Sequence, residues 1–318
     1  MEAVDVIVFG SAIVDFICYC PRLPKVGETL HGDRFSTGFG GKGANQCVAA
    51  ARLGAKTAMI ASLGDDQWGR DYLENLRKEG VNTDFVQLIQ GETTGIAAIN
   101  VSEGGDNQIV IVVGANNKLS AQGLKDAVKK FTEPKVLICQ LETPVTETIE
   151  ALKLFSGVSI LNAAPAMKNA PQDLIRFASI LCVNESEAGL MTGMEVSSVQ
   201  DAKGAIKRFI ELGANTVIIT MGGKGAVYSE AKSRKVIHVP VESVAKVVDT
   251  TGAGDAFIGV LAYFIAKHPN MSMTQTIGAA CEIASISVQH PGTQSSFPYA
   301  KNIEDRNLLS KKFAYFDL

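Results

Sequence analysis

The chain has 318 residues, of which 46% are hydrophobic and 20% charged, a length that allows one large domain with an appendage or two domains. Its net charge of -3 and its pI near 5.9 provide no basic field for nucleic acid or an anionic membrane. The longest apolar run, residues 256–266, is too short to span a bilayer, and residues 1–5 do not resemble a signal peptide. We therefore expect a cytoplasmic protein, with nuclear entry left open, and no nucleic-acid or membrane partner.

Apolar runs alternate with helical periodicity along most of the chain. The first run, from Val4 to Phe9, ends at Gly10-Ser11 and predicts a buried strand. Further runs of this kind fall at 57–61, 136–141, 158–161, 180–183 and 217–220, and helical segments include 120–131, 146–154 and 199–212. Continuous apolar strands that alternate with amphipathic helices are typical of a parallel sheet covered on both faces. The sequence therefore predicts a doubly wound α/β fold with a mostly parallel sheet.

Two regions, residues 13–37 and 95–113, interrupt this alternation. The second contains two apolar runs, 96–101 and 108–113, joined by the turn-rich segment 103–106, and no helix lies between them. This pattern predicts a β-hairpin. We expect a single α/β domain over residues 1–318 with a small β-lid formed by about 13–37 and 95–113.

The first glycine-rich segment, GFGGKGANQ at 38–46, precedes a predicted helix at 44–53. Glycines allow the backbone to approach a ligand, and the amides of the following helix would face it. Gly38, Gly40 and Gly43 also match the dinucleotide pattern G-x-G-x-x-G, with Asp65 about 20 residues later, as in a nicotinamide-dependent oxidoreductase. That fingerprint should directly follow the first core strand, however, and here a polar stretch precedes it. We keep the oxidoreductase as the remote alternative.

The second glycine-rich segment, DTTGAGDAF at 249–257, carries the stronger chemical signal. Gly252, Ala253 and Gly254 can point successive N–H groups inward at the start of a helix, which suits phosphoryl oxygens. Asp255 in the first turn is either a helix cap or a catalytic carboxylate, and its position directly after the glycines favours catalysis. The helix N-terminus is expected to lower the pKa of Asp255. In a loose phosphoryl-transfer transition state the carboxylate mainly orients the hydroxyl and accepts its proton.

With these motifs the sequence resembles the ribokinase family of carbohydrate kinases, the phosphofructokinase-B type. GGKGAN at 40–45 and DTTGAGDAF at 249–257 match its two signatures, Asn184–Glu187 matches its N-x-x-E motif, and Thr220–Gly225 resembles its nucleotide loop. The likeness covers the chain from Gly10 to Ser296, and GFGGKGANQ is closer to the ribose-phosphorylating members than to fructokinases or adenosine kinases. The resemblance implies a ribokinase-like fold and ATP-dependent phosphorylation of the 5-hydroxyl of D-ribose, with Asp255 as base and Gly252–Gly254 as anion hole. The alternatives are another sugar or nucleoside kinase of the family, such as a fructokinase-like or deoxyribokinase-like enzyme, and a catalytically silent sugar-binding regulator.

The resemblance also assigns binding residues. Taken singly, Asp15 could simply end a strand, Asn45 could cap a helix and Glu142 could be a solvated acid. Their joint occurrence at the family spacing favours a role in binding the hydroxyls of the sugar. The implied sugar contacts are Ile13, Val14, Asp15, Gly41, Lys42, Gly43, Ala44, Asn45, Glu142 and Asp255. The implied nucleotide contacts are Asn184, Thr220, Met221, Gly222, Gly223, Lys224, Gly225, Gly254, Asp255 and Cys281. Two positions depart from the usual pattern, since bacterial members mostly carry asparagine in place of Ile13 and often in place of Cys281.

The same resemblance implies two metal ions and a homodimer. Glu187 would help to place Mg²⁺, mostly through water, because Mg²⁺ keeps several waters and neutralises the β- and γ-oxygens of ATP. A K⁺ ion beside the anion hole would take oxygens from Asp249, Thr251, Ser287, His290, Gly292 and Ser296, and would fix the 249–255 loop without touching the substrate. The apolar strand 109–113 needs covering, and we expect a homodimer through the β-lid.

Overall fold

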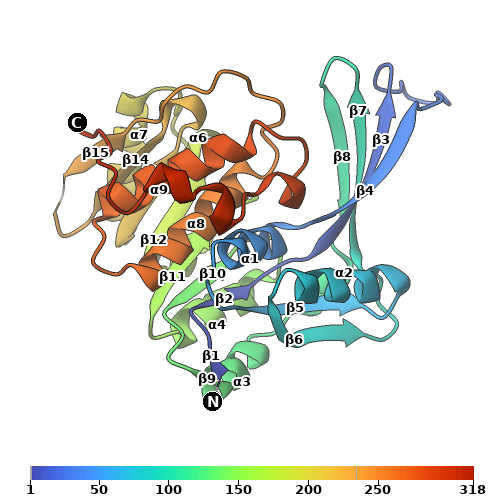
Figure 1. Cartoon of the computed structure of the whole chain (residues 1–318), viewed down its shortest axis with the longest axis horizontal. Helices are drawn as coiled ribbons and strands as arrows, with labels where there is room; N and C mark the ends of the chain where they lie inside the picture. Colours follow the sequence, from blue (N-terminus) through green and yellow to red (C-terminus); the bar gives the residue numbers. More distant parts are fainter. Residues whose placement is uncertain (1, 234) are drawn as a thin grey trace.

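The computed structural model describes residues 2–233 and 235–318. It consists of a ten-stranded sheet between two layers of helices, from which a four-stranded sheet projects (Figure 1). No helix in these two ranges is long and apolar enough to cross a membrane.

The large sheet confirms the predicted α/β fold. Its order is β16-β15-β14-β13-β12-β11-β10-β2-β5-β6. The seven parallel strands are β2 (Val6–Phe9), β5 (Thr57–Gly64), β6 (Asn82–Ile89), β10 (Val136–Cys139), β11 (Val158–Asn162), β12 (Ile180–Asn184) and β13 (Thr216–Thr220). Antiparallel strands β14 (Ala226–Glu230), β15 (Val236–Val239) and β16 (Phe316–Asp317) extend one edge, and the short β1 (Glu2–Ala3) pairs with β9 (Phe131–Thr132). The chain starts in the middle of the sheet and reverses direction between β2 and β10, where doubly wound folds bind ligands.

Two hydrophobic clusters lie on the two faces of this sheet. Alternate residues of a strand point to opposite faces, so Val6 and Val8 enter one cluster while Ile7 and Phe9 enter the other. Helices α1 (Lys42–Arg52), α2 (Gln67–Lys78), α8 (Ala253–Lys267) and α9 (Met273–Ser287) cover the first face. Helices α3 (Gln122–Lys130), α4 (Val145–Leu154), α5 (Gln172–Phe177), α6 (Glu185–Thr192) and α7 (Val199–Glu211) cover the second.

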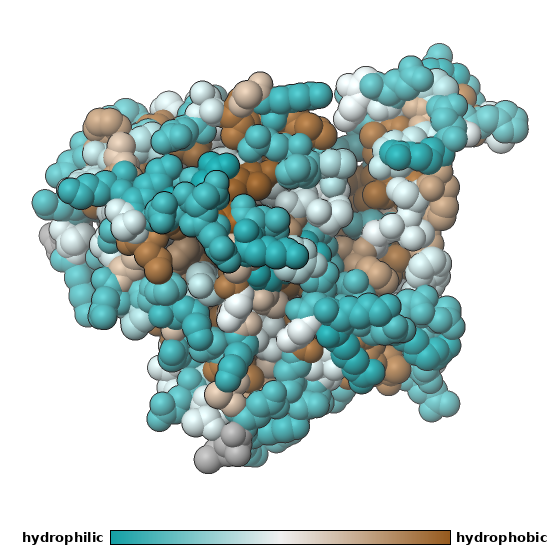
Figure 2. Space-filling view, in the orientation of Figure 1, coloured by the Kyte–Doolittle hydropathy of each residue, from teal (hydrophilic) through white to brown (hydrophobic). Residues whose placement is uncertain are grey.

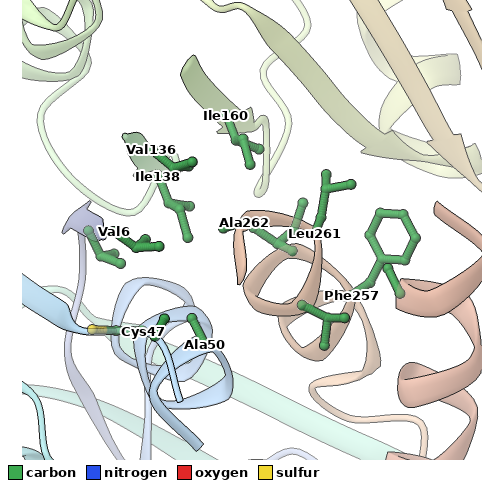
Figure 3. Close-up of a cluster of buried hydrophobic side chains, with 14 of the residues drawn as sticks. Val6, Cys47, Ala50, Val136, Ile138, Ile160, Phe257, Leu261 and Ala262 are labelled. Atoms are coloured by element: carbon green, nitrogen blue, oxygen red, sulfur yellow. The ribbon is translucent and has the colours of Figure 1, made fainter. Parts of the chain in front are cut away.

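The core beneath α1 and α8 fixes how these two helices sit over the centre of the sheet. Figure 3 shows strand residues such as Val6, Ile138 and Ile160 directed toward small residues of the helices, including Ala50 of α1 and Ala262 of α8. A Cβ at Gly259 of α8 would lie 2.5 Å from the carbonyl oxygen of Gln46, so the two helices approach closely only because residue 259 has no side chain. This packing brings the first turn of α8 beside the first turn of α1.

The projecting sheet, here called the lid sheet, has the order β4-β3-β7-β8. It consists of β3 (Ile13–Cys20), β4 (Arg34–Gly40), β7 (Gly95–Ser102) and β8 (Asn107–Val112). The predicted hairpin is confirmed, since β7 and β8 pair antiparallel from Ile96–Val112 to Val101–Asn107. Strand β4 runs three residues beyond the expected boundary at residue 37, because residues 38–40 pair with residues 13–15 of β3. Figure 2 shows a mostly hydrophilic body, with brown side chains along the lid sheet and where it joins the body.

Candidate active site

A cluster of polar side chains lies at the carboxyl ends of the central strands. Parallel strands end at the same edge of a sheet, so residues that follow different strands meet there. These residues are Ser11 after β2, Gln140 and Glu142 after β10, Asn162 and Asn184 at the ends of β11 and β12, and Thr220 at the end of β13. A cavity of about 180 Å³ opens at this edge, lined among others by Lys42, Asn162, Asn184, Glu187, Thr220, Gly252, Gly254 and Asp255. The structure therefore gathers residues from both glycine-rich segments and from the N-x-x-E motif around one cavity.

The first turn of α8 forms one wall of this cavity. Gly252 has a φ of 78°, and a Cβ there would lie 2.5 Å from Cγ2 of Thr293, so only glycine fits this position. The backbone N–H groups of Gly252, Gly254 and Asp255 have no hydrogen-bond partner within the described residues, whereas that of Ala253 donates to the Thr250 carbonyl at 3.3 Å. Free amides at a helix N-terminus bind anions. The turn can therefore hold phosphoryl oxygens.

Asp255 is buried at the base of the cavity, with a side chain that is 8% exposed. Its Oδ1 accepts a hydrogen bond from Gln46 Nε2 and its Oδ2 accepts one from Asn45 Nδ2, both at 2.9 Å. Burial raises the pKa of Asp255 above its usual value, against the opposing effects of Lys42 and the two amides. The expectation that the helix N-terminus lowers this pKa is wrong, because desolvation outweighs it. A carboxylate of raised pKa is a better proton acceptor.

Lys42, at the start of α1, carries the positive charge of the site. Burial alone would lower its pKa, yet the net shift is upward because the carboxylates of Asp255, Glu142 and Glu187 favour the ammonium. The resemblance assigns this residue to the sugar. In the structure it lines the same cavity as the α8 turn, so its ammonium is placed where it can also interact with an anion held by that turn.

Asp15 brings the lid sheet into the site. Burial and the nearby carboxylates Glu142 and Asp255 raise the pKa of Asp15 from 3.8 to about 7. A Cβ at Gly40 of the neighbouring strand would lie 2.4 Å from Asp15 Oδ2, so the glycine makes room for this carboxylate. Residue pairing places Ala97 and Ile111 on the same face of the lid sheet as Asp15. Sequence reasoning missed these two apolar residues, although strict alternation along the hairpin indicates them.

Gly41 and the first turn of α1 lie beside Glu142. Glu142 Oε2 accepts hydrogen bonds from the Ser11 hydroxyl at 2.6 Å and from the Lys42 backbone N–H at 2.9 Å, which leaves Oε1 for a ligand. Close backbone contacts explain the glycines, since a Cβ at Gly41 would lie 2.6 Å from the Ile13 nitrogen and one at Gly43 would lie 2.5 Å from the Ser11 nitrogen. Of the other residues assigned to the sugar, Ala44 and Val14 pack in the hydrophobic core and Ile13 is buried at 2% exposure.

The N-x-x-E motif forms a capping box at the start of α6. Asn184 Oδ1 accepts from the Glu187 N–H, and Glu187 Oε2 accepts from the Asn184 N–H, both at 2.8 Å. Glu187 also lines the cavity, and burial raises its pKa, with Lys42 opposing. Within residues 2–233 and 235–318 no group of three or more His, Cys, Asp or Glu side chains could enclose a metal ion. One carboxylate beside a phosphate site still suits Mg²⁺, which takes most of its ligands from water and phosphate.

The residues assigned to the nucleotide lie along β13, the turn after it and α9. Thr220 ends β13 and lines the cavity, and the 3₁₀ turn η2 (Gly222–Lys224) follows, closed by a hydrogen bond from the Met221 N–H to the Gly225 carbonyl at 2.8 Å. The Met221 side chain is buried in the core and faces no ligand. Cys281 of α9 is 7% exposed, and burial raises the pKa of its thiol to about 12, so it presents a neutral sulfur. A second cavity of about 370 Å³ lies between residues 240–245 and α9, lined by neighbours of Cys281 that include Gly278, Glu282 and Ser285.

The residues assigned to K⁺ lie in the segment before α8, at the end of α9 and in the segment after α9. Asp249 Oδ1 accepts from the Thr251 N–H and Oδ2 accepts from the Gly292 N–H, both at 2.9 Å, which joins the segment before α8 to the segment after α9. Ser287 is the last residue of α9, and His290 and Ser296 lie in this second segment. The Ser287 and Ser296 hydroxyls donate to backbone carbonyls at 2.8 Å. Carboxylate, hydroxyl and carbonyl oxygens are hard ligands that fit an alkali cation.

Comparison with known proteins decides the family. The profile of the pfkB family carbohydrate kinases matches residues 4–300. The chain belongs to the pfkB family of carbohydrate kinases. It is 46% identical over 305 residues to a ribokinase from Mus musculus, covering 95% of this chain and 94% of the relative, and 35% identical over 297 residues to a deoxyribokinase from Salmonella typhi, covering 92% and 95%. The solved structure of Arabidopsis thaliana ribokinase complexed with ribose and ATP matches with a TM-score of 0.86 at 30% identity, covering 98% of this chain and all of that one.

The first glycine-rich segment is not the dinucleotide fingerprint of an oxidoreductase, as both the family and the structure show. Gly38 and Gly40 lie in strand β4 of the lid sheet, not in a turn that follows a strand of the parallel sheet. A dinucleotide fingerprint requires a core strand, a turn and a helix in succession. The glycines instead connect the lid sheet to α1, which rules out the oxidoreductase alternative.

Several polar residues of the pfkB site were missed by sequence reasoning. Gln46, Gln140 and Asn162 are hydrogen bonded to one another or to Asp255, and Ser11 holds Glu142. Gln46 directly follows the recognised motif, and Ser11, Gln140 and Asn162 follow or end apolar strands. Polar residues at the carboxyl ends of predicted parallel strands were the available signal.

Proposed function

We propose that this chain is a ribokinase, which transfers the γ-phosphoryl group of ATP to the 5-hydroxyl of D-ribose. The observation that carries the proposal is a buried carboxylate, Asp255, directly after the free amides of the α8 turn and in the same cavity as Lys42. A base, an anion site and a positive charge around one cavity are what phosphoryl transfer needs. The identity to a ribokinase over nearly the whole chain supports ribose as the acceptor.

In the proposed reaction the sugar lies between the lid sheet and the carboxyl ends of the strands. Asp15, the free Oε1 of Glu142 and the remaining amide hydrogen of Asn45 hydrogen-bond its hydroxyls, and Ala97 and Ile111 cover it when the lid sheet closes. A site that pairs each hydroxyl rejects alcohols that lack one. The 5-hydroxyl then points at Asp255, whose oxygens each retain a lone pair beyond the amide bond they accept.

The transfer itself is a single displacement. The bond from the ribose O5 to the γ-phosphorus forms as the bond from that phosphorus to the bridging oxygen breaks, and ADP leaves. The hydroxyl proton passes to Asp255, while Lys42 and the amides of Gly252, Gly254 and Asp255 stabilise the charge on the equatorial oxygens. We assign the adenine to the cavity between residues 240–245 and α9, and the phosphates to the path past Thr220 and Asn184.

The proposal includes two cations, a dimer and a cytosolic setting. Glu187 would hold Mg²⁺, largely through water, and the ion would neutralise the β- and γ-oxygens. K⁺ would bind among the oxygens of Asp249, Thr251, Ser287, His290, Gly292 and Ser296 and would stiffen the loop that leads into α8. The exposed apolar strand β8 supports a homodimer through the lid sheet, and ATP as donor together with free thiols suits the cytosol.

The test is ADP release from ATP and Mg²⁺ with a panel of D-ribose, 2-deoxy-D-ribose, D-fructose and adenosine. We expect the highest kcat/KM with D-ribose, a 5-phosphate product by NMR, and faster turnover in K⁺ than in tetramethylammonium. Preference for another alcohol would keep the kinase chemistry and discard ribose. No turnover with any of these acceptors would overturn the kinase proposal, and equal turnover in the two cations would overturn the K⁺ assignment.

A further inference from the structure

Two chains of buried amide side chains end on the two carboxylate oxygens of Asp255. In the first chain Gln140 Nε2 donates to Gln46 Oε1 at 2.8 Å, and Gln46 Nε2 donates to Asp255 Oδ1 at 2.9 Å. In the second chain Gln294 Nε2 donates to Asn45 Oδ1 at 3.0 Å, and Asn45 Nδ2 donates to Asp255 Oδ2 at 2.9 Å. Gln46 and Gln140 are fully buried, and Asn45 and Gln294 are 4% and 7% exposed. Two buried neutral amides thus bind the carboxylate, and two more bind those amides.

The carboxylate fixes the orientation of both amides that touch it. An ionised carboxyl group only accepts hydrogen bonds, so Gln46 and Asn45 must turn their NH₂ groups toward Asp255. Their carbonyl oxygens then point away, into the protein, and only a donor can pair with them there. Gln140 and Gln294 supply these donors, since each presents its NH₂ group to the carbonyl in front of it. A reversed Gln46 or Asn45 would place two acceptors face to face in a buried site.

Gln140 and Gln294, here called the outer amides because they lie farther from Asp255 than the inner amides Gln46 and Asn45, are themselves held by the fold. Gln140 directly follows β10, and its Oε1, which has no partner within the described residues, occupies the space where a Cβ of residue 10 would lie 2.0 Å away. Gln294 begins the 3₁₀ turn η3 (Gln294–Ser296), and its Oε1 accepts from Asn75 Nδ2 at 3.2 Å. Its Nε2 also donates to the Tyr72 hydroxyl at 3.2 Å, and that hydroxyl donates to the Gly40 carbonyl at the end of the lid strand β4. The orientation of Gln294 is therefore set by contacts that do not involve the substrate, whereas Gln140 is oriented by the hydrogen bond that its Nε2 donates to Gln46.

We propose that Gln46 and Gln294 are positioning residues for Asp255, with Gln46 acting directly on the carboxylate and held by Gln140, and Gln294 acting through Asn45. The proposal rests on the proposed function, because it takes Asp255 to be the base of the reaction. Neither Gln46 nor Gln294 needs to touch the sugar or the nucleotide. Their role is to keep the carboxylate rotated so that its remaining lone pairs face the acceptor hydroxyl.

Removing an inner or outer amide has distinct consequences. Without Gln46, Oδ1 loses its donor, the carboxylate can rotate, and its ionised form is less favoured, so the pKa of Asp255 rises further. Without Gln294, the Asn45 amide can flip and turn its carbonyl toward Oδ2. None of the substitutions changes the charged side chains around Asp255, which are Lys42, Asp15, Glu142 and Glu187.

The experiment uses methionine, which has nearly the length of glutamine but cannot hydrogen-bond. In Gln46→Met we expect kcat to fall about tenfold to a hundredfold, the value of a hydrogen bond to a charged group, and in Gln294→Met about twofold to tenfold, the value of a hydrogen bond between neutral groups. In Gln46→Met the acid limb of kcat/KM against pH should also move up by roughly one unit, since the base needs a higher pH to ionise. Gln122→Met, an exposed glutamine of α3, is the matched control and should change neither quantity.

A double-mutant cycle separates positioning from packing. Gln140 acts only through Gln46, so Gln140→Met alone should give a smaller upward shift of the same limb, and adding it to Gln46→Met should change kcat by less than about twofold. Gln46 and Gln294 belong to different amide chains, so the fold-changes in kcat of Gln46→Met and Gln294→Met should multiply in the double variant. The Gln140 variant also keeps the test valid if Gln46→Met does not fold.

Two outcomes would overturn the inference. One is a kcat and an acid limb that match wild type in both Gln46→Met and Gln140→Met, while Asp255→Asn is inactive. The other is full additivity of Gln46→Met and Gln140→Met, which would mean that they act independently. If wild type uses an acceptor other than ribose, the same series is run with that acceptor, so failure of the assigned substrate and failure of the positioning role remain distinguishable.

Discussion

The core side and the lid side of the proposed site differ in how far their side chains are buried and hydrogen bonded. On the core side, Asp255 is 8% exposed and both its oxygens accept hydrogen bonds from buried amides. On the lid side, Asp15 stands on a four-stranded sheet whose edge strand β8 exposes Ile109 to Val112, each by 47–67%. The difference teaches that the proposed catalytic group is preorganised by the fold, whereas the proposed sugar-binding face leaves an apolar surface that still needs a cover.

Removing the carboxylate of Asp255 tests the core side and should have the largest effect. Asp255→Asn keeps the shape but removes the proton acceptor, so kcat should fall by about a thousandfold or more, with a much smaller change in the KM for the sugar. Steady-state ADP release measures this, with Asp305→Asn, an exposed aspartate, as the control. Retention of more than about a tenth of the wild-type kcat would mean that the core side does not supply the base.

Removing the charge of Asp15 tests the lid side and should act on binding. Asp15→Asn loses a charged acceptor for a sugar hydroxyl, so the KM for the sugar should rise about tenfold to a hundredfold. Glu28→Gln, in the loop between β3 and β4, changes a charge in the same part of the chain and is the control. A KM equal to that of wild type would remove Asp15 from the sugar site.

The same variant has a predictable effect on stability. The pKa of Asp15 rises from 3.8 to about 7, so the ionised group disfavours the folded state, and its contribution to the free energy of unfolding declines as the pH rises from about 4 through about 7. Asparagine does not ionise. The Tm of Asp15→Asn relative to wild type should therefore be higher at about pH 8 than at about pH 5. A Tm difference that does not change with pH would contradict the raised pKa.

A substitution on the exposed face of β8 should have the smallest of these effects, and it should act on the proposed dimer. Val110 pairs with Ala98, which pairs with Phe16, so it lies on the face of the lid sheet opposite to Asp15. An aspartate at Val110 would place a charge in the proposed dimer contact, and we expect the dimer to weaken by about tenfold in Kd while the fold is kept. Light scattering over a range of protein concentrations measures this, with Glu103→Gln in the hairpin turn as control. A wild-type protein that is monomeric at micromolar concentration would refute the dimer itself.

The limits of sequence reasoning are clearest at Asp255. The motif around it was recognisable because a helix N-terminus preceded by glycines is a local feature, and local features leave a signature in consecutive residues. The direction of its pKa shift was predicted wrongly, because burial depends on the packing of α1 against α8, which no short motif encodes. The amides that hold it were missed because Gln46 and Gln294 lie far from residue 255 along the chain.

The sequence alone determined the alternation of apolar strands and helices, the hairpin of the lid sheet and the two glycine-rich segments. Strands buried on both faces must be apolar runs, and close backbone approach requires glycine, so each leaves a pattern that can be read without coordinates. Only the tertiary structure decided that Lys42 shares a cavity with the α8 turn, that burial raises the pKa of Asp15 to about 7, and that two chains of amides end on Asp255. These features depend on distances between residues from different elements, and on the water that packing removes around them.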